Sequence, residues 1–347
     1  MRYQRQTLLP QIGDTGQARL ARSRVLLVGC GALGTVAAEQ LVRAGVGMIR
    51  IVDRDIVELT NLQRQVLFDE QDVREQTPKA IAAANRLGRI NSSVRIEPVV
   101  ADFHAGNAEE LAGLIEGGRI DLILDGSDSV ETRYLLNDVS VKHAVPWIYG
   151  ACVGTVGRAM AIIPPKTACL RCLFVQPNGA GELPTCDTAG VFSPVPAVVA
   201  SLQAAAAIKI LVGKSEAAAE ELFVIDLWEN HLRAISTAAA KRPDCIACGQ
   251  RHFEYLEHRA GSATASLCGR NAIQIRPANW RTAIDLSDLA AKLAGAGKLE
   301  QTPHLLRCQL TEPADVKLTV FADGRLIVHG TADPERARSI YARFIGS

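Results

Sequence analysis

Residues 25–52 read VLLVGCGALGTVAAEQLVRAGVGMIRIV, and this stretch decides the fold. Val25–Val28 and Met48–Val52 are short runs of β-favouring residues, while residues 35–44 between them carry apolar side chains at helical spacing. A strand, a helix and a strand within about 30 residues form a βαβ unit, whose two strands run parallel. The sequence therefore predicts an α/β fold built on a Rossmann-like parallel sheet.

The same alternation continues along the first half of the chain, and the later strands extend the sheet. One helix is expected from Pro78 to Ile90, with Thr77 as its N-cap and Pro78 at its first position. A Gly/Pro-rich stretch, residues 177–196, lies among the later strands, and so long a loop in a compact domain is usually functional. The other expected strands and helices are residues 94–100, 120–124, 130–143, 147–153, 158–163 and 222–226.

With 347 residues, the chain exceeds the size at which one hydrophobic core usually stops growing. We expect one large domain over residues 1–250 and a small α+β domain of unknown role over residues 261–347. In the second, Asp323-Gly324 predicts a hairpin, and helices are expected at residues 286–293 and 334–344.

The charge balance and the apolar segments limit the partners and the compartment. A net charge of +1 gives no global reason to bind nucleic acid or anionic lipid. Residues 194–212 are apolar but contain Ser201, Gln203 and Lys209, so they predict a buried helix and not a membrane span. Because residues 1–10 contain no apolar signal region, we expect a cytoplasmic protein.

The segment Gly29-Cys30-Gly31-Ala32-Leu33-Gly34 follows a predicted strand and opens a predicted helix, as the G-x-G-x-x-G pattern requires. Glycines allow backbone amides to approach phosphates at the helix N-terminus. Asp53 lies at the end of the second strand, where a carboxylate can bind a ribose hydroxyl. Together these residues predict a nucleotide site without naming the nucleotide.

Several polar side chains after Asp53 suit a phosphoryl-handling site. On a short helix, Asn61, Arg64 and Gln65 would share one face, and a guanidinium there stabilises charge on phosphate oxygens. Lys79 lies in the first turn of its helix, a position that disfavours a cation unless an anion is bound. A solvated polar helix is the alternative interpretation.

Asp125-Gly126-Ser127-Asp128 follows a strand at the carboxyl edge of the sheet, where α/β folds bind ligands. Asp128 is a candidate metal ligand at this edge. Since Glu131 stands three residues later, Asp128 is also a candidate N-cap in a capping box.

Two Cys-x-x-Cys pairs, Cys169/Cys172 and Cys245/Cys248, predict a tetrahedral zinc site that joins two distant segments. Four thiolates leave no open coordination position, so the zinc is expected to be structural. Cys186 lies in the Gly/Pro-rich loop, and its reactivity does not follow from the sequence.

Five motifs, taken in their order along the chain, resemble those of the ThiF/MoeB/HesA adenylyltransferases, which are relatives of the ubiquitin-activating enzymes. The resemblance runs from Arg2 to Cys248, and its most specific part is DRDIVELTNLQRQ at residues 53–65. The other motifs are RYQRQ at residues 2–6, TPKA at 77–80, DGSDS at 125–129, and the cysteine pairs CLRC and CIAC.

The resemblance implies that the chain binds MgATP and adenylates the C-terminal glycine carboxylate of a small ubiquitin-like sulfur carrier protein ending in Gly-Gly. It implies a homodimer in which Arg5 reaches the phosphates of the other subunit, and a role in thiamine or molybdenum-cofactor synthesis. Asp128 would bind Mg²⁺, and Cys186 aligns with a cysteine that some members use covalently. The implied nucleotide-binding residues are Gly29, Gly31, Ala32, Gly34, Asp53, Asp55, Asn61, Arg64, Lys79, Asp128 and Ser129.

Two departures and three alternatives accompany this resemblance. Ala32 stands where the family usually has glycine, and Ser129 where it usually has asparagine. The first alternative is an activating enzyme that goes on to form a thioester or persulfide at Cys186. The others are an NAD-dependent oxidoreductase that uses the same glycine loop, and a scaffold that binds nucleotide without turnover.

Overall fold

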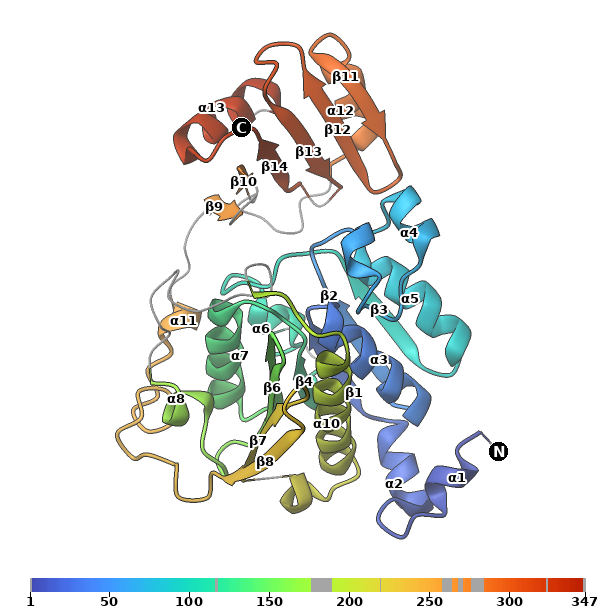
Figure 1. Cartoon of the computed structure of the whole chain (residues 1–347), viewed down its shortest axis with the longest axis vertical. Coiled ribbons are helices and arrows are strands. Elements are labelled where there is room, and N and C mark those ends of the chain that lie inside the picture. Colours follow the sequence, from blue (N-terminus) through green and yellow to red (C-terminus); the bar gives the residue numbers. More distant parts are fainter. Residues whose placement is uncertain are drawn as a thin grey trace. The chain divides into compact units, whose positions relative to one another are not determined.

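The computed structural model describes residues 2–115, 118–175, 189–218, 220–257, 264–267, 271–275, 284–322 and 324–345. The chain divides into two compact units. Unit 1 comprises residues 1–74 and 78–259, and unit 2 comprises residues 75–77 and 260–347. Figure 1 shows the elements of both units.

Unit 1 contains an eight-stranded sheet in the order β3-β2-β1-β4-β5-β6-β7-β8. The strands β1 to β5 pair in parallel. Parallel strands need a crossover connection, and here these connections run along the faces of the sheet. This confirms the predicted Rossmann-like α/β fold. The five strands are β1 (Arg24–Val28), β2 (Met48–Val52), β3 (Arg95–Val99), β4 (Leu122–Asp125) and β5 (Trp147–Val153).

The sheet changes from parallel to antiparallel at β5. Its parallel pairing with β4 covers only Ile123↔Trp147 and Leu124↔Ile148, whereas its antiparallel pairing with β6 runs along the whole strand. The remaining strands are β6 (Val156–Ile162), β7 (Glu221–Asp226) and β8 (His231–Ser236). All residues of the edge strand β8 are exposed, so this end of the sheet faces solvent in the monomer.

Helices cover both faces of the parallel half. Helices α3 (Ala32–Ala44), α5 (Lys79–Ile90) and α10 (Pro194–Leu211) contribute to one hydrophobic core with the sheet. Helix α7 (Val130–His143) packs against β4 and β5. Figure 1 shows α10 beside α3, and the two are in contact.

Helix α10 was expected to be buried. Within the described part of the chain it is the one helix long and apolar enough to cross a membrane, by length and composition alone. It contacts α3, β5 and β6, and Val195, Val199, Ala200 and Ala204 lie in the core. These contacts are those of a core helix that covers a sheet.

The N-terminus of α5 differs from the prediction by one residue. Pro78 has an extended backbone with ψ 136° and forms an isolated β-bridge with Ile56, so it takes the N-cap position in place of Thr77. Lys79 is therefore the first helical residue. The shorter helices of unit 1 are α1 (Gln4–Thr7), α2 (Gly13–Leu20), η1 (Leu59–Asn61), α4 (Glu70–Glu75), α6 (Ala108–Leu111), α8 (Leu170–Leu173), η2 (Ser215–Ala218) and α11 (Glu254–Glu257).

Unit 2 is an antiparallel sheet in the order β11-β12-β13-β14-β10-β9, with a core formed by the sheet and two helices. The predicted hairpin is confirmed, since β13 and β14 pair antiparallel and Gly324 has φ 84° in the turn. The elements are β9 (Thr264–Leu267), β10 (Ala272–Ile275), α12 (Leu286–Leu293), β11 (Gly297–Gln301), β12 (Leu305–Leu310), β13 (Lys317–Phe321), β14 (Leu326–His329) and α13 (Pro334–Phe344).

Candidate functional site

The glycine loop lies between β1 and α3, and two of its glycines are required by close packing. Gly29 has φ 88°, and a Cβ added there would collide with the backbone of Gly126. A Cβ added at Gly34 would collide with the carbonyl of Gly29. Beside Gly31, by contrast, an added Cβ would find its nearest neighbour, the Gln65 amide nitrogen, 3.8 Å away. The loop is therefore tight at both ends and open at Gly31.

Asp53, at the end of β2, is fixed by two backbone donors. Its Oδ2 accepts a hydrogen bond from the Cys30 amide at 2.6 Å, and its Oδ1 accepts one from the Asp55 amide at 2.7 Å. Burial raises the pKa of Asp53, although Lys79 opposes this shift. The carboxylate thus connects the glycine loop to the segment that follows β2.

Lys79 points back to the same segment. Its Nζ lies 3.0 Å from Oδ2 of Asp55, and its amide donates to the Asp55 carbonyl at 2.8 Å. Burial lowers the pKa of Lys79, but Asp55 and Asp53 more than offset this effect and raise it. Lys79 is therefore buried and charged, and it lies near Asp53, which is hydrogen-bonded to the glycine loop.

The polar segment after β2, where a short helix was expected, forms the 3₁₀ turn η1, which ends at Asn61. Asn61 and Gln65 are buried, whereas Arg64 is partly exposed and donates to the Thr60 carbonyl at 2.9 Å. Arg64 is therefore the most exposed of the three side chains. The buried Oε1 of Gln65, whose amide nitrogen faces Gly31, has no hydrogen-bond partner among the described residues. An unsatisfied polar atom beside an open loop is consistent with a ligand site.

Sequence reasoning missed a buried ion pair at the end of β4. Arg133 Nε lies 3.2 Å from Asp125 Oδ2, and Arg133 Nη2 donates to the Ser127 carbonyl at 2.8 Å. Burial raises the pKa of Asp125, and Arg133 opposes this rise. Asp125 ends β4 and Arg133 lies in the first turn of α7, and no sequence motif joins the two. The pair fixes the 126–129 turn between β4 and α7.

The structure corrects one interpretation of this turn, since Asp128 is not the N-cap of α7. Ser129 is the N-cap, and its hydroxyl accepts a hydrogen bond from the Thr132 amide at 3.2 Å. Asp128 is exposed and close enough to Lys79, Arg54 and Arg133 to influence their pKa values. Asp128 therefore lies on the Lys79 side of the turn, with its carboxylate available to solvent.

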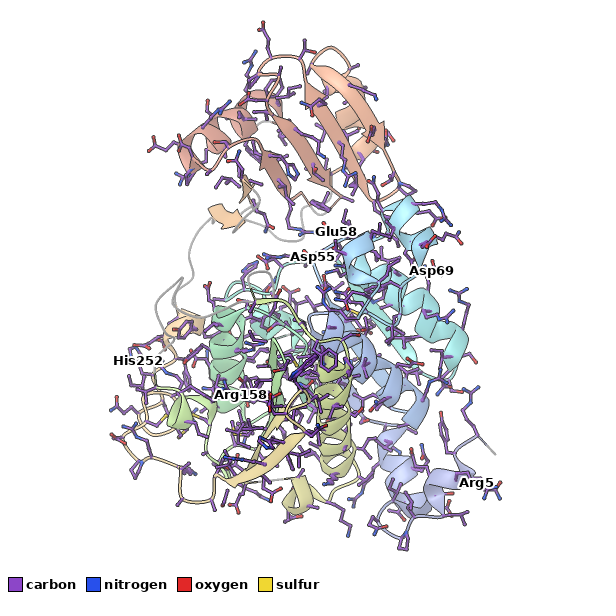
Figure 2. The ribbon with its side chains drawn as sticks, viewed as in Figure 1. Arg5, Asp55, Glu58, Asp69, Arg158 and His252 are labelled. Carbon is purple, nitrogen blue, oxygen red and sulfur yellow. The ribbon has the colours of Figure 1, made fainter. Side chains whose placement is uncertain are left out.

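Two expected residues do not join this cluster. Arg5, in α1, is exposed and lies at the opposite end of unit 1 from Asp55 and Glu58 (Figure 2). Within one chain it does not reach the glycine loop. Cys186 lies outside the described residues, as does most of the Gly/Pro-rich segment.

The two described ends of that segment are anchored to unit 1. Upstream, the Phe174 carbonyl accepts a hydrogen bond from the Tyr134 hydroxyl at 3.0 Å. Downstream, Gly154 and Val191 form a parallel β-bridge, and Ser193 Oγ donates to the Gln63 carbonyl at 2.8 Å. The downstream end thus ties the β5–β6 turn to the segment that carries Arg64.

The four cysteines of the two Cys-x-x-Cys pairs come together. Neighbouring sulfur atoms lie 3.4 to 3.9 Å apart, and all four Sγ atoms lie within 4.8 Å of one another. Four sulfurs on a zinc ion at about 2.3 Å would be separated by about 3.8 Å, so the donor set and the spacing both fit Zn²⁺. The cluster joins α8 to the loop after β8.

Helix α7 accepts hydrogen bonds from backbone amides near both cysteine pairs. Asn137 Oδ1 accepts from the Leu170 amide at 2.8 Å, and Asp138 Oδ2 accepts from the Tyr255 amide at 2.9 Å. Burial raises the pKa of Asp138 to about 6. One helix therefore connects the cysteine cluster to the Asp128 turn at its other end.

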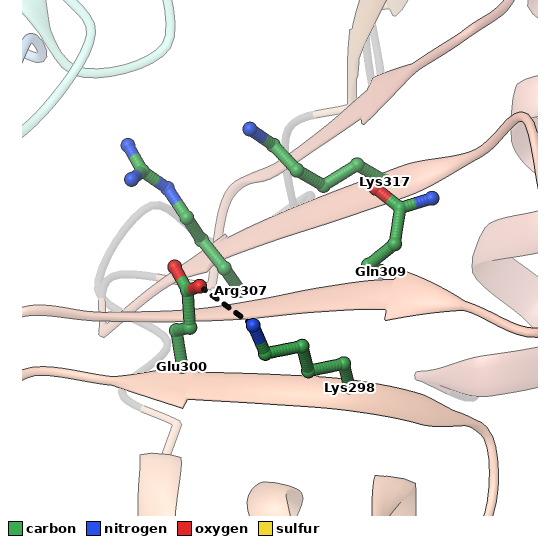
Figure 3. Close-up of a pocket in the computed structure, with 5 residues that line it drawn as sticks. All are labelled: Lys298, Glu300, Arg307, Gln309 and Lys317. Atoms are coloured by element: carbon green, nitrogen blue, oxygen red, sulfur yellow. Dashed lines mark ion pairs between the residues drawn. The ribbon is translucent and has the colours of Figure 1, made fainter.

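Unit 2 contains a separate hollow of about 260 Å³ on the sheet formed by β11, β12 and β13. Figure 3 shows its lining, in which Lys298 pairs with Glu300 at 4.0 Å. The other lining residues are Arg307, Gln309 and Lys317. The sequence analysis identified none of these residues as functional. The role of unit 2 stays unassigned.

Comparison with known protein families covers most of unit 1. The model of the ThiF family matches residues 3–247. The chain belongs to the ThiF family. This confirms the resemblance inferred from the motifs and, since ThiF-family relatives of high identity are adenylyltransferases, the chain is an enzyme of that class. The oxidoreductase alternative is thereby set aside.

One ThiF-family relative matches the entire length. The sulfur carrier protein ThiS adenylyltransferase of Bacillus subtilis (strain 168) is 43% identical over 347 residues, which cover 99% of both chains. A sulfur carrier protein adenylyltransferase of Thermus thermophilus is 40% identical over 253 residues, covering 72% of this chain and 90% of its own. A crystal structure of E. coli MccB with MccA-N7isoASN is similar over 72% of this chain and 74% of its own, with a TM-score of 0.63 and 24% identity, which shows a shared fold.

Proposed function

We propose that this ThiF-family adenylyltransferase uses MgATP to adenylate the C-terminal glycine carboxylate of a ubiquitin-like sulfur carrier protein. The observation that carries the proposal is the juxtaposition of Lys79, Asp53 and the glycine loop in a chain 43% identical to a named ThiS adenylyltransferase. A carrier of the ThiS class, ending in Gly-Gly, is the proposed substrate, and synthesis of thiamine or molybdenum cofactor in the cytoplasm is the proposed setting.

The site residues suit the nucleotide's parts. The open Gly31 and the amide of Gln65 suit the phosphates, and Asp53, whose oxygens already accept backbone bonds, suits the ribose hydroxyls. Lys79, Arg64 and Asn61 are proposed to hold the triphosphate, with Gly29, Ala32, Gly34, Asp55 and Ser129 shaping the site. Asp128, exposed beside Lys79, is the proposed Mg²⁺ ligand.

The reaction needs positioning and charge neutralisation more than proton transfer. A carboxylate oxygen of the carrier attacks the α-phosphorus, the bond to the β-phosphate bridge oxygen breaks, and pyrophosphate leaves with its electron pair. Because the nucleophile is already an anion, no general base is required. The chain contributes the Lys79 ammonium and the guanidinium of Arg64, which stabilise negative charge on the phosphate oxygens.

A second copy of the chain is proposed to complete the site. Arg5 lies far from Asp55 within one chain, and exposed apolar side chains stand near both positions: Leu8 and Leu9 beside Arg5, and Leu59 and Val66 beside Arg64. Contact between these two patches in a homodimer would bury the four side chains and bring Arg5 to the phosphates. The four-cysteine cluster is proposed to hold a structural Zn²⁺.

The experiment that tests the function is ATP–pyrophosphate exchange with the full chain, Mg²⁺ and a panel of carriers ending in Gly-Gly. Exchange that depends on one carrier supports the proposal and identifies that carrier. ATP binding without exchange for any carrier contradicts it and favours a nucleotide-binding scaffold. Since Cys186→Ser leaves adenylation intact in this scheme, loss of exchange in that variant would instead favour a covalent role in the first step.

A further inference from the structure

Tyr149 and Arg158 form a pair on the β5–β6 hairpin that the nucleotide site does not use. The two are diagonal neighbours on one face of the hairpin, since Tyr149 pairs with Met160 and Arg158 pairs with Ala151. Burial raises the pKa of Tyr149, and the nearby charge of Arg158 opposes this rise. The Tyr149 ring also lies 5.7 Å from the guanidinium carbon of Arg133, which is paired with Asp125. The pair is thus continuous with the Asp125–Ser129 turn and extends from it across the sheet.

Arg158 lies on the face of the sheet opposite α10. A Cβ added at the neighbouring Gly157 would collide with Val199 and Val195 of α10, so residue 158 points to the other face. Arg158 is exposed there, opposite the half-buried Ala151 of β5. A charged side chain that is exposed beside a buried tyrosine can reach a ligand on this face.

The anchors of the Gly/Pro-rich segment flank this pair. Phe174, at the upstream end, stacks at 6.1 Å from the Tyr149 ring, and Val191, at the downstream end, is bridged to Gly154 in the hairpin turn. Ala151 and Arg158 lie between these two anchors along the hairpin.

We propose that Arg158, oriented by Tyr149, binds the backbone carbonyls of the carrier's extended C-terminal tail and so sets the affinity for the carrier. This inference rests on the proposed function. A Gly-Gly tail has no side chains, so recognition must use its carbonyls, its amides and its terminal carboxylate. A guanidinium offers five N–H donors in a fixed plane, and its positive charge attracts the anionic end of the tail.

The chain supplies a matched control. Arg233 of β8 lies in the same cross-strand row as Arg158, through Val224, and is also exposed, but it is three strands away from Tyr149. Replacing either arginine by alanine removes the same charge from the same face. Only Arg158 lies on the hairpin that contacts Phe174 and Val191.

The test measures ATP–pyrophosphate exchange kinetics and carrier binding for Arg158→Ala, Arg158→Lys, Tyr149→Phe and Arg233→Ala. We expect Arg158→Ala to raise KM for the carrier and its Kd about tenfold or more, with kcat and KM for ATP within about twofold of wild type. Arg158→Lys should recover part of the loss, and Tyr149→Phe should cause a smaller rise in KM. Arg233→Ala should match wild type.

Equal effects of Arg158→Ala and Arg233→Ala would overturn the proposal, since a diffuse surface charge would then explain both. A fall in kcat with unchanged carrier KM would overturn it as well. Thermal unfolding of each variant separates these results from loss of the fold. If the wild-type chain neither exchanges pyrophosphate with any Gly-Gly carrier nor binds one, the proposed function itself has failed, and the role of Arg158 with it.

Discussion

Lys79 and Asp55 are joined twice, by an ion pair of 3.0 Å between their side chains and by a hydrogen bond of 2.8 Å between their backbones. The side chain of Lys79 is nearly buried, whereas that of Asp55 is 56% exposed. The aspartate therefore keeps Lys79 charged and holds its position, while its own carboxylate stays exposed, so an anion from solvent can approach the pair. A triphosphate is such an anion.

Lys79→Ala is expected to reduce ATP–pyrophosphate exchange about 100-fold or more, because a positioned charge on the transferring phosphoryl group is lost. Asp55→Asn should cause a smaller loss of about tenfold, since the ammonium remains but is less well aimed. Lys142→Ala, which breaks a surface pair with Glu109, serves as the control. Wild-type exchange in Lys79→Ala would remove Lys79 from the site.

Asp128 and Ser129 are neighbours with separable roles. Ser129→Ala removes the N-cap of α7 and should lower the free energy of unfolding by about 1 kcal/mol, with activity retained at low temperature. Asp128→Ala should leave urea unfolding unchanged and abolish Mg²⁺-dependent exchange. If Asp128→Ala destabilises the fold as much as Ser129→Ala, the assignment of the cap is incorrect.

Gly34 and Gly31 of the glycine loop should respond differently to substitution by alanine. Gly34→Ala places a methyl group against the Gly29 carbonyl and is expected to abolish ATP binding and to lower the melting temperature. Gly31→Ala meets its first neighbour at 3.8 Å, so its melting temperature should stay close to wild type while KM for ATP rises. Calorimetry and ATP titration of both variants test this difference, which disappears if the loop rearranges freely.

Purified protein is expected to contain about one equivalent of zinc per chain. Cys172→Ser should lose the metal and lower the melting temperature, because zinc binding adds its free energy to that of folding. Cys308→Ala, which changes a buried cysteine of unit 2, should keep the full equivalent. Elemental analysis of wild type and both variants decides the matter, and an equal zinc content in all three would falsify the assignment.

Asp138 should make stability depend on pH in a predictable direction. Burial raises its pKa in the folded state to about 6, above the ordinary 3.8, so the folded chain binds the proton more tightly than the unfolded chain. Stability from this group is therefore present at low pH and lost as the pH rises through about 6. Relative to Asp138→Asn, the wild type should lose about 2–3 kcal/mol of unfolding free energy between pH 4 and pH 7. Parallel urea curves with a constant difference across that range would contradict the prediction.

Much of the parallel half could be predicted because its strands are buried on both faces and read as continuous apolar runs. Residues 48–52, 130–143 and 147–153 were predicted with the bounds that the structure has. The edge strand β8 was missed because all its residues are exposed, so no burial pattern marks it. The start of α5 was predicted one residue early because the bridge between Pro78 and Ile56 is a tertiary contact.

The candidate site was predicted unevenly for a related reason. Gly29, Gly34 and Asp53 follow local rules of turn and strand end, and the structure brings them together. The Asp125–Arg133 pair depends on the packing of α7 against β4, which no local pattern encodes. Asp128 was a candidate cap through its spacing from Glu131, as the alternative to a metal role, but Ser129 directly precedes the first helical residue and is the N-cap.

The change of direction at β5 has a consequence for how such an enzyme can diversify. The proposed nucleotide-binding residues follow the parallel strands, and the proposed tail contact lies on the antiparallel strands. The ladder between β4 and β5 consists of two residue pairs. Substitutions on β6–β8 can therefore change which protein is activated without disturbing the phosphate chemistry. The short pairing between β4 and β5 would thus allow the same adenylation reaction to act on different acceptor proteins.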